Sequence, residues 1–552
     1  MHQLAFSSLV KQKHNSYGMN KIFTLAITSV ILLTACHHPK TEDKKTYIRN
    51  KAINAHNAYN NLFLDSAALE KFITLRNIAD ADADALRSFY YQRNFEFAWF
   101  ARYHINEQGR AFWNLASYNK TAFKNSIAFG QCLSKRLPNI TAEDTVWASP
   151  KDTFFVSTEL MLTEAFIQFM PTTEKNLQAD QMERYLPAQK QDVMTAAVQQ
   201  LAATEDAGLT KDAQQAYLQL KSQLTKYYVI AKNGGWPTVP FSGKKYKKGI
   251  TAPLITQIKN RLSITGEYRE YNTSPFYDTI LYTAVTKAQT AFGYTPDGTI
   301  TDSLLKDLNV PATKRVQQLL INLARLRWMP EAVKGRFITA NIPEYMLHVY
   351  NNKAKVFDMG VVVGKQNSAT VVFTGNLNEI VFSPYWNIPT SIIKNEIVPK
   401  MKDDTGYLAR QNMEIKGYKN GLPVVRQLPG ANNSLGRIKF LFNNSYNIYF
   451  HDTPAKEFFS RRKRAYSHGC IRLSDPVKMA AYLLDNNKEW TPEKITAAMN
   501  SPTEIYVPLK QSVPVVITYY TAWANEKGEL NLRDDIYGHD AETAEKMFTA
   551  AQ

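Results

Sequence analysis

The sequence predicts a multidomain α+β protein: a helical N-terminal region, a small three-helix unit and a β-rich C-terminal region. Its 552 residues exceed what one hydrophobic core supports, so three or four domains are expected. Apolar residues recur every three or four positions from about residue 50 to 310, and at every second position from Arg336 onward. Hydrophobic residues make up 44% and charged residues 21%, which indicates folded protein rather than disorder.

The chain is basic, with a formal net charge of +17. Such a charge favours an anionic partner, such as nucleic acid, a membrane surface or an acidic polymer. The sequence contains no zinc-finger spacing and no RNA-binding signature, so no nucleic-acid partner is predicted. Basic residues cluster only at Lys244–Lys248 and Arg461–Arg464, and a solvated loop explains each run equally well.

Residues 1–35 predict a secretory signal peptide. A charged start at Met19 precedes an apolar stretch, Ile22–Ala35, which is too short to span a ~30 Å hydrocarbon core as a helix. Because the pattern begins at Met19, that residue is an alternative start to Met1.

The residues Leu33–Cys36 resemble the bacterial lipobox. The resemblance implies cleavage before Cys36 and a lipid on its sulfur, with an ordinary signal peptide and a chance cysteine as the alternative. A lipid at Cys36 implies a chain anchored to a membrane, inner or outer, at the periplasmic face of the cell envelope. Residues 36–84 then form a tether and a helical lead-in.

Residues 85–240 predict a helical scaffold domain, because apolar positions recur at helical spacing over long stretches such as 194–201 and 211–224. No cluster of acids, bases or metal ligands stands out there. The three cysteines of the chain are too few for a disulfide framework, and Cys132 fits a small buried hydrophobe within this domain.

Residues 245–312 predict a compact unit of three helices with a turn at Thr295–Gly298. The unit resembles the small three-helix peptidoglycan-binding domain, and the resemblance implies binding to the bacterial wall. It rests on a degenerate pattern that runs through Tyr277-Asp278, Ala284-Val285, Ala288-Gln289, Phe292-Gly293, Asp297–Ile300 and Leu305–Asn309. A plain helical bundle is the alternative.

Residues 336–507 predict a β-rich domain. Alternating apolar residues indicate strands, followed by a helix over Ser474–Asn486; the strands are expected at 336–342, 346–350, 356–363, 380–383, 438–442 and 446–451. Residues from about 390 to 430 break the strand pattern, with a helix near Lys394–Lys402 and an irregular stretch at Gly417–Pro423, and predict an inserted lid. Residues 508–552 predict a C-terminal extension, one strand and a short helix, without chemistry of its own.

The chemistry is concentrated in two short strings, Tyr449–Asp452 and Ser467–Leu473. A cysteine becomes a nucleophile when its thiolate is stabilised and a base takes its proton. Cys470 and His451 are candidates for these two roles, and Gly469 allows a sharp turn whose N–H groups can face an oxyanion. A metal site at His451, His468 and Cys470 lacks a fourth ligand, so no metal is predicted. A buried cysteine in a glycine turn is the remaining alternative.

A His followed by fifteen residues and then Ser-His-Gly-Cys is similar to the signature of the L,D-transpeptidase catalytic domain. Trp386–Pro389, Leu428–Gly430 and Leu435-Gly436 also resemble the large periplasmic branch of that family, as does the order of scaffold, wall-binding unit and catalytic domain with a lid. One departure is Arg472, where many members have Asn; both residues occur, so activity is not in doubt.

The resemblance implies that Cys470 attacks a stem tetrapeptide of peptidoglycan and releases D-Ala, with His451 as base and no metal or organic cofactor. The main-chain carbonyl of Asp452 orients His451, and the N–H groups of Gly469 and Cys470 hold the oxyanion. Further candidates for substrate contacts are Tyr449, Trp386, Ser467, His468 and Arg472. For Tyr449, Trp386 and Arg472 packing is the alternative, and His468 fits a structural role better than that of a second base.

The predicted product is a 3→3 cross-link. Hydrolysis by the same residues (carboxypeptidase or endopeptidase), attachment of a protein to the wall, and a non-catalytic wall-binding lipoprotein are the alternatives, the last disfavoured by the intact Cys470 and His451. The sequence leaves open the diamino acid of the stem, the oligomeric state and whether an envelope partner activates the enzyme.

Overall fold

The structure, a computed structural model, describes most of the chain beyond residue 44. The described residues are 45–101, 104–118, 133, 135–137, 147–169, 179–203, 209, 211–270, 272–330, 335–444 and 446–550. Cys36 and Cys132 lie outside them, as does the predicted signal peptide. The chain from Tyr47 onward forms one unit by its contacts. No helix in the described segments is both long and apolar enough to cross a membrane.

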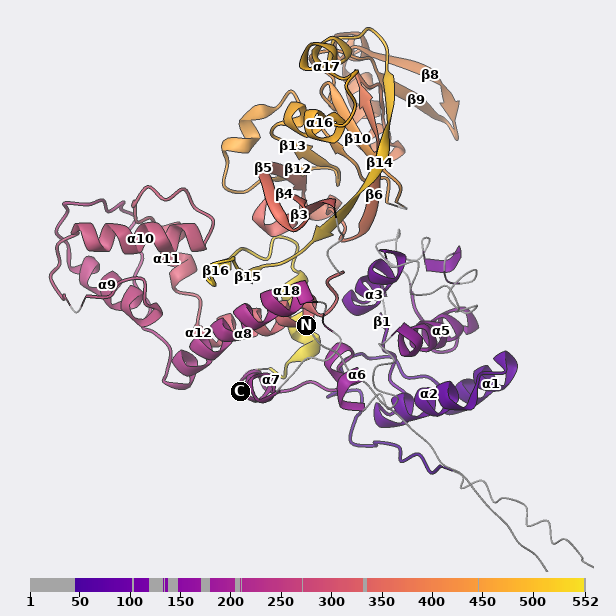
Figure 1. Ribbon diagram of the computed structural model, residues 1–552, viewed down its shortest axis with the longest axis vertical. Coiled ribbons are helices and arrows are strands. Elements are labelled where there is room, and N and C mark those ends of the chain that lie inside the picture. The colour runs from indigo at the N-terminus through magenta and orange to yellow at the C-terminus, as the bar shows by residue number, and fades with distance from the viewer. Residues whose placement is uncertain are drawn as a thin grey trace, which may run out of the picture. The chain divides into compact units, whose positions relative to one another are not determined.

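The N-terminal region is helical, as the sequence predicts (Figure 1). Its elements are α1 (Ser66–Arg76), α2 (Asp80–Gln92), β1 (Phe100–Ala101), β2 (His104–Ile105), α3 (Glu107–Tyr118), α5 (Thr153–Phe169), α6 (Ala179–Tyr185), α7 (Val193–Ala202) and α8 (Lys211–Lys232). Helix α5 contributes buried residues on all sides from Leu160 to Ile167. The ring of Trp99 stacks on Phe112 in the same core, with centroids 5.2 Å apart.

The predicted three-helix unit consists of α9 (Pro253–Thr265), α10 (Thr279–Ala291) and α11 (Asp302–Leu308). Lys259 and Asp278 form an ion pair at 2.7 Å that joins α9 to the N-terminus of α10. The Tyr277 hydroxyl donates to the carbonyl of Gly298 at 2.6 Å and fixes the predicted turn. Helix α12 (Ala312–Leu326) follows and shares a hydrophobic core with α8 and with the three-helix unit.

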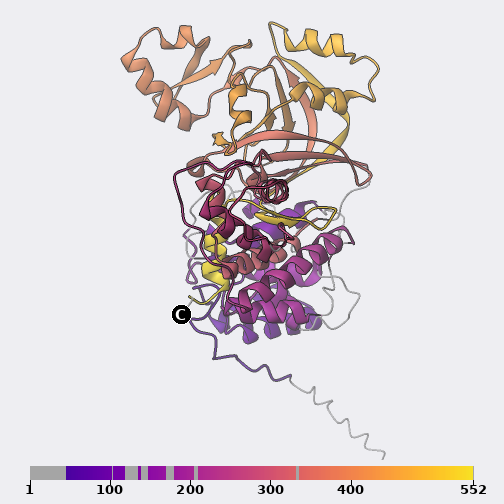
Figure 2. The same cartoon turned by 90° about the vertical axis from the view of Figure 1, so that its left-hand side faces the viewer.

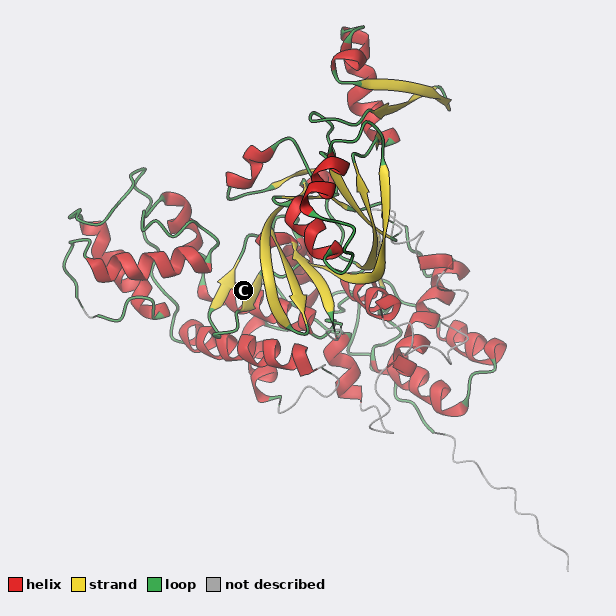
Figure 3. Ribbon diagram, turned by 45° about the horizontal axis from the view of Figure 1, so that its top comes forward, coloured by secondary structure: helices red, strands yellow, loops and turns green. Residues whose placement is uncertain are grey.

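The β-rich region is built on nine strands in the order β12-β5-β13-β11-β10-β6-β14-β3-β4 (Figure 3). Strand β5 also pairs with β4, which closes the sheet into a ring around an apolar core. The strands are β3 (Arg336–Asn341), β4 (Met346–Asn351), β5 (Ala354–Gly364), β6 (Thr374–Phe382), β10 (Ile438–Phe442), β11 (Phe450–His451), β12 (Ala465–Ser467), β13 (Ile471–Leu473) and β14 (Ile505–Thr518). Helices α16 (Pro476–Leu484) and α17 (Pro492–Met499) cover this core.

Short helical turns link these strands. They are η2 (Ile342–Glu344), η3 (Gln366–Ser368) and η5 (Lys456–Ser460). The strand expected at 446–451 is confined to its last two residues, because Asn444 accepts the backbone N–H groups of Tyr446 and Ile448 and bends the chain before β11.

The insertion expected at 390–430 is a separate lobe of the β-rich region, apart from α16 and α17 in Figure 2. It contains β7 (Trp386–Asn387), α13 (Thr390–Ile392), the π-helix η4 (Ile393–Ile397), α14 (Val398–Asp403), α15 (Tyr407–Arg410), β8 (Met413–Lys419) and β9 (Leu422–Gln427). The stretch Gly417–Pro423, expected to be irregular, lies in the hairpin of β8 and β9. That expectation was wrong: the stretch pairs regularly with its partner strand, although β8 has no buried residue and a bulge between Ile415 and Gly417 interrupts its alternation.

The boundary expected between residues 507 and 508 falls inside β14, which continues to Thr518 and pairs with both β6 and β3. The sequence hides this continuity because a bulge between Pro508 and Val513 interrupts the alternation. The remaining elements are β15 (Ala522–Ala524), β16 (Leu530–Leu532) and α18 (His539–Met547). The tail also supports the sheet, since the Tyr537 hydroxyl donates to the Gly364 carbonyl at 2.6 Å.

Two carboxylates, Glu96 and Glu159, are completely buried in the helical region. Glu159 accepts the backbone N–H groups of Ala98 and Trp99, at 2.5 and 3.1 Å. Burial raises the pKa of Glu159 to about 7 and that of Glu96 to about 8. Both values lie above the ordinary glutamate pKa of about 4.3, so the folded state keeps protons that the unfolded chain has lost between about pH 4.3 and pH 8.

We therefore expect the stability contributed by these groups to be complete below about pH 4.3 and to fall as the pH rises to about 8. Glu159→Gln carries no proton that titrates, so its midpoint of thermal unfolding should depend less on pH than that of the wild type. Glu183→Gln, at an exposed position of α6, is the control and should follow the wild type. Parallel pH profiles for Glu159→Gln and the wild type would contradict the assignment.

Candidate active site

The pairing of short strands makes His451 and Cys470 neighbours. Strand β11 lies between β10 and β13, and in the parallel pair of β11 with β13 Phe450 faces Ile471 and His451 faces Arg472. Cys470 is the residue directly before β13. The backbone N–H of Ile471 donates to the carbonyl of Tyr449 at 3.1 Å and fixes the two segments in this register.

His451 is 4% exposed, and its Nδ1 lies 2.5 Å from the main-chain carbonyl oxygen of Asp452, the contact expected from the sequence. Donation to a carbonyl requires the proton on Nδ1, which leaves Nε2 as a free base. Burial, followed by the positive charge of Arg472, lowers the pKa of His451 to about 3. The imidazole is therefore neutral at neutral pH and able to accept a proton.

Cys470 is a free, half-buried thiol whose Sγ lies 3.7 Å from the carbonyl oxygen of Asn447. Burial raises the pKa of this thiol, whereas contacts from Tyr449 and the charges of Lys439 and Arg472 lower it. Among the hydrogen bonds of the described residues, none joins Cys470 to His451. The resting site is thus a neutral thiol beside a neutral imidazole, and catalytic hydrogen bonds of this kind often tighten only when substrate binds.

The loop before Cys470 is held from within by Ser467. Its hydroxyl donates to the carbonyl of Cys470 at 2.5 Å and accepts the N–H of Gly469 at 3.2 Å. Gly469 has φ +112°, a backbone conformation that favours glycine. Thr370 adds a hydrogen bond of 2.7 Å from its hydroxyl to the Gly469 carbonyl.

These bonds concern two of the expected site residues. Ser467 is 2% exposed, and its hydroxyl is engaged within the loop and shapes it. The N–H of Gly469, an expected oxyanion donor, is donated to Ser467 in this structure. The N–H of Cys470 has no acceptor within the described part of the chain, which leaves it as the donor best placed for an oxyanion.

Tyr449 lies beside both reactive groups. Its ring meets that of His451 edge-on with centroids 5.8 Å apart, and burial followed by the charge of Cys470 raises the pKa of its hydroxyl. The sequence analysis missed Lys439, whose Nζ lies 4.5 Å from the centre of the Tyr449 ring. The available signal was a charged residue inside the apolar strand Ile438–Phe442.

The other expected substrate contacts are dispersed. Trp386 is in β7 and packs against the small core of the insertion, and no described contact joins it to Cys470. The Nε2 of His468 lies 2.8 Å from Glu396 of η4, so this side chain joins the catalytic loop to the insertion. Arg472 is half-buried, its guanidinium lies 5.9 Å from the Phe458 ring, and its Nε has no hydrogen-bond partner.

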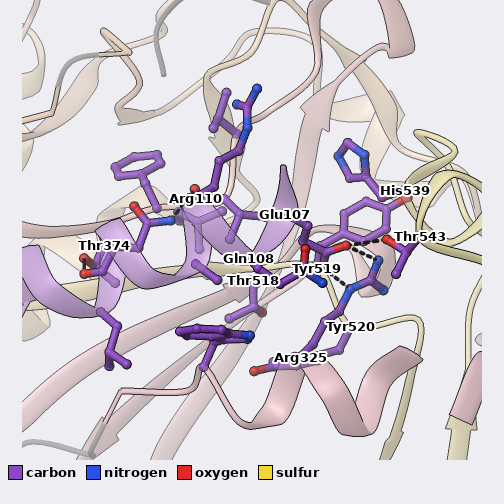
Figure 4. A pocket seen from close by; sticks show the side chains of 18 of the residues that line it. Glu107, Gln108, Arg110, Arg325, Thr374, Thr518, Tyr519, Tyr520, His539 and Thr543 are labelled. Atoms are coloured by element: carbon purple, nitrogen blue, oxygen red, sulfur yellow. Dashed lines mark hydrogen bonds and ion pairs between the residues drawn. The ribbon is translucent and has the colours of Figure 1, made fainter. Parts of the chain in front are cut away.

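A separate cavity of about 320 Å³ lies among α3, residues 369–374, the end of β14 and α18 (Figure 4). Neither Cys470 nor His451 lines it. Its polar wall is an ion-pair network in which Arg325 contacts Glu107 at 2.5 Å and the Thr543 hydroxyl donates to Glu107 at 2.6 Å. Thr370 lines this cavity and also bonds to Gly469, so the cavity backs onto the catalytic loop.

Two segments of the chain match known protein domains. Residues 335–517 match the L,D-transpeptidase catalytic domain, and residues 84–224 match a scaffold domain. A curated Haemophilus influenzae protein, provisionally named an L,D-transpeptidase, is 33% identical over 250 residues, which are 42% of this chain and 50% of that protein. The chain thus spans half the length of this curated relative.

Two solved structures are also similar. The L,D-transpeptidase of Xylanimonas cellulosilytica is 13% identical, covers 50% of this chain and 99% of its own, and has a TM-score of 0.16. L,D-transpeptidase 3 of Mycobacterium tuberculosis, with a faropenem-derived adduct, is 14% identical, covers 34% of this chain and 62% of its own, and has a TM-score of 0.18. TM-scores this low carry no further argument.

The site and the matched segments define a protein with an L,D-transpeptidase catalytic domain. A scaffold domain, matched over residues 84–224, precedes this catalytic domain in the chain.

The ion pair between Glu396 and His468 provides a test of the insertion as a lid. An ion pair this exposed contributes about 0.2 to 1 kcal/mol, so Glu396→Ala should speed amide exchange in residues 390–397 and 468–470 by no more than about fivefold. Glu414→Ala is the control, because it breaks ion pairs with Arg426 and Lys416 inside the insertion alone. Hydrogen exchange measured by mass spectrometry decides. An equal rise in the same segments of Glu414→Ala, or strong protection across 390–430 in the wild type, would contradict a mobile lid.

Proposed function

We propose that the chain forms 3→3 cross-links in peptidoglycan as an L,D-transpeptidase that acts through a cysteine thioester. The observation that carries the proposal is the pairing of β11 with β13, which puts a neutral base, His451, beside the free thiol of Cys470 inside a matched L,D-transpeptidase catalytic domain. The net charge of +17 suits an anionic wall polymer as substrate.

In the proposed first half-reaction, Cys470 Sγ attacks the carbonyl between the third residue of a stem tetrapeptide and its terminal D-Ala. His451 Nε2 accepts the thiol proton. The Cys470 N–H holds the oxyanion, joined by the Gly469 N–H once it is released from Ser467. The C–N bond then breaks, His451 returns the proton to the leaving amine, and D-Ala departs from a thioester on Cys470.

In the second half-reaction the side-chain amine of another stem attacks the thioester. His451 accepts a proton from this amine as the new C–N bond forms, and the C–S bond breaks. The proton then returns to the departing sulfur of Cys470, which regenerates the thiol. The groove walls in this proposal are Tyr449 and, after closure of the insertion, Trp386. Water in place of the amine gives hydrolysis by the same steps.

The proposal places the enzyme at the wall through two further parts of the chain. The three-helix unit of α9, α10 and α11 binds peptidoglycan, and a lipid on Cys36 anchors the mature chain to a membrane at the periplasmic face of the envelope. An anchored enzyme with a separate wall-binding unit meets its substrate at a raised effective concentration.

The test is the intact mass of the purified chain after incubation with a disaccharide-tetrapeptide. We expect an acyl adduct on Cys470 and one released D-Ala per adduct. Cys470→Ala should form no adduct, and His451→Gln should form it about 10²- to 10⁴-fold more slowly, because the general base is lost. Thermal unfolding of each variant controls for folding.

The products then separate the remaining alternatives. Cross-linked dimers support the transferase, whereas tripeptides without dimers support a hydrolase. If a folded chain with a reduced thiol gives no adduct and releases no D-Ala, the proposal is overturned. A wall tether, or an enzyme that awaits an activating partner, then takes its place. Full cross-linking by Cys470→Ala would remove the central role of this residue.

A further inference from the structure

Lys439 occupies a position in the site that the proposed mechanism does not use. It is the second residue of β10, and it is the direct partner of His451 in the antiparallel pair of β10 with β11. On its other side it pairs with Val381 of β6, so its backbone is fixed between two strands. The side chain is half-buried, and its ammonium lies 4.5 Å from the centre of the Tyr449 ring.

This ammonium has no anionic partner in the described part of the chain. The nearest carboxylates that act on it are Glu504 and Glu379, and neither forms an ion pair with it. Both oxygens of Glu504 are already engaged, one with the N–H of Tyr385 at 2.7 Å and the other with the hydroxyl of Tyr506 at 2.9 Å. Burial correspondingly lowers the pKa of Lys439.

A half-buried cation without a partner is costly, and most such side chains are paired or exposed. The second cation of the site, Arg472, is also half-buried and has an unpartnered Nε. The anion that would pair with Lys439 and Arg472 is the thiolate of Cys470. It is absent from the resting site because Cys470 is protonated there. It is created in the reaction, when the proton leaves the sulfur.

We propose that Lys439 is the electrostatic partner of the Cys470 thiolate, so that its ammonium, fixed opposite His451 and against Tyr449, determines the pH range in which Cys470 reacts. Three groups act on the sulfur in this balance, Tyr449, Lys439 and Arg472, and His451 lies on the paired strand β11. The inference rests on Cys470 being the nucleophile, and it does not depend on which substrate is acylated.

The two cations act on different members of the catalytic pair. Lys439 lowers the pKa of Cys470 more than Arg472 does. For His451 the order is reversed, because Arg472 lowers its pKa more than Lys439 does. Lys439 therefore mainly favours the thiolate, and Arg472 mainly keeps the imidazole neutral. Tyr449 lies between Lys439 and the sulfur and can donate its hydroxyl to the thiolate.

The test is the rate of alkylation of Cys470 by iodoacetamide as a function of pH, with the modified peptide identified by mass so that Cys36 and Cys132 do not contribute. Lys439→Met keeps an unbranched side chain of similar length and removes the charge, and its reactivity profile should move upward by about one pH unit or more. Lys439→Arg should keep the wild-type profile. Lys494→Met is the matched control, because Lys494 also lies over an aromatic ring, Trp490, at 4.9 Å but is outside the site.

An unchanged profile in Lys439→Met would overturn the proposal, and so would an equal shift in Lys439→Arg, since only packing would then be involved. Thermal unfolding is the second readout. Removing an unpaired charge should leave Lys439→Met at least as stable as the wild type, whereas a large loss of stability without a shift in the profile would show a structural role and overturn the inference. Alkylation needs no wall substrate, so failure of the transpeptidase assay leaves this result independent.

Discussion

The parallel pairing of β11 with β13 is the contact on which the catalytic arrangement depends. Each strand is only two or three residues long, so neither is stable alone, and both are held by longer neighbours, β10 on one side and β5 on the other. The pairing puts the base at the end of one strand and the nucleophile at the start of the next. A slip of one residue would turn His451 away from Cys470, because side chains alternate between the faces of a strand.

The loop that carries Cys470 is stabilised from distant parts of the sequence. The Ser467 hydroxyl holds it from within, and Thr370 bonds to Gly469 from the chain before β6. Thr370 in turn donates its N–H to the hydroxyl of Tyr537, a residue of the C-terminal tail. The tail thus supports the catalytic loop through two hydrogen bonds, which gives a physical reason for its packing against the domain.

Sequence patterns predicted the elements whose burial is regular. Strands such as β3 and β10 alternate clearly, and the helices of the three-helix unit show the 3.6-residue period. The hairpin of β8 and β9 was missed because β8 has no buried residue and is bulged between Ile415 and Gly417, and the continuity of β14 was missed because that strand also contains a bulge. At the site, residue types indicated Cys470 and His451, and the family resemblance implied the role of the Asp452 carbonyl. The engagement of the Gly469 N–H by Ser467 was not predictable, since hydroxyl direction depends on loop geometry that no residue type specifies.

In the proposed mechanism, the charges of the site explain how a half-buried thiol becomes a nucleophile. Burial alone disfavours both the thiolate and the imidazolium, so transfer of the proton from Cys470 to His451 creates two disfavoured ions. The positive charges of Lys439 and Arg472 stabilise the thiolate and further destabilise the imidazolium. The transferred proton is therefore held weakly by His451, and it passes readily to a leaving amine once the C–N bond breaks.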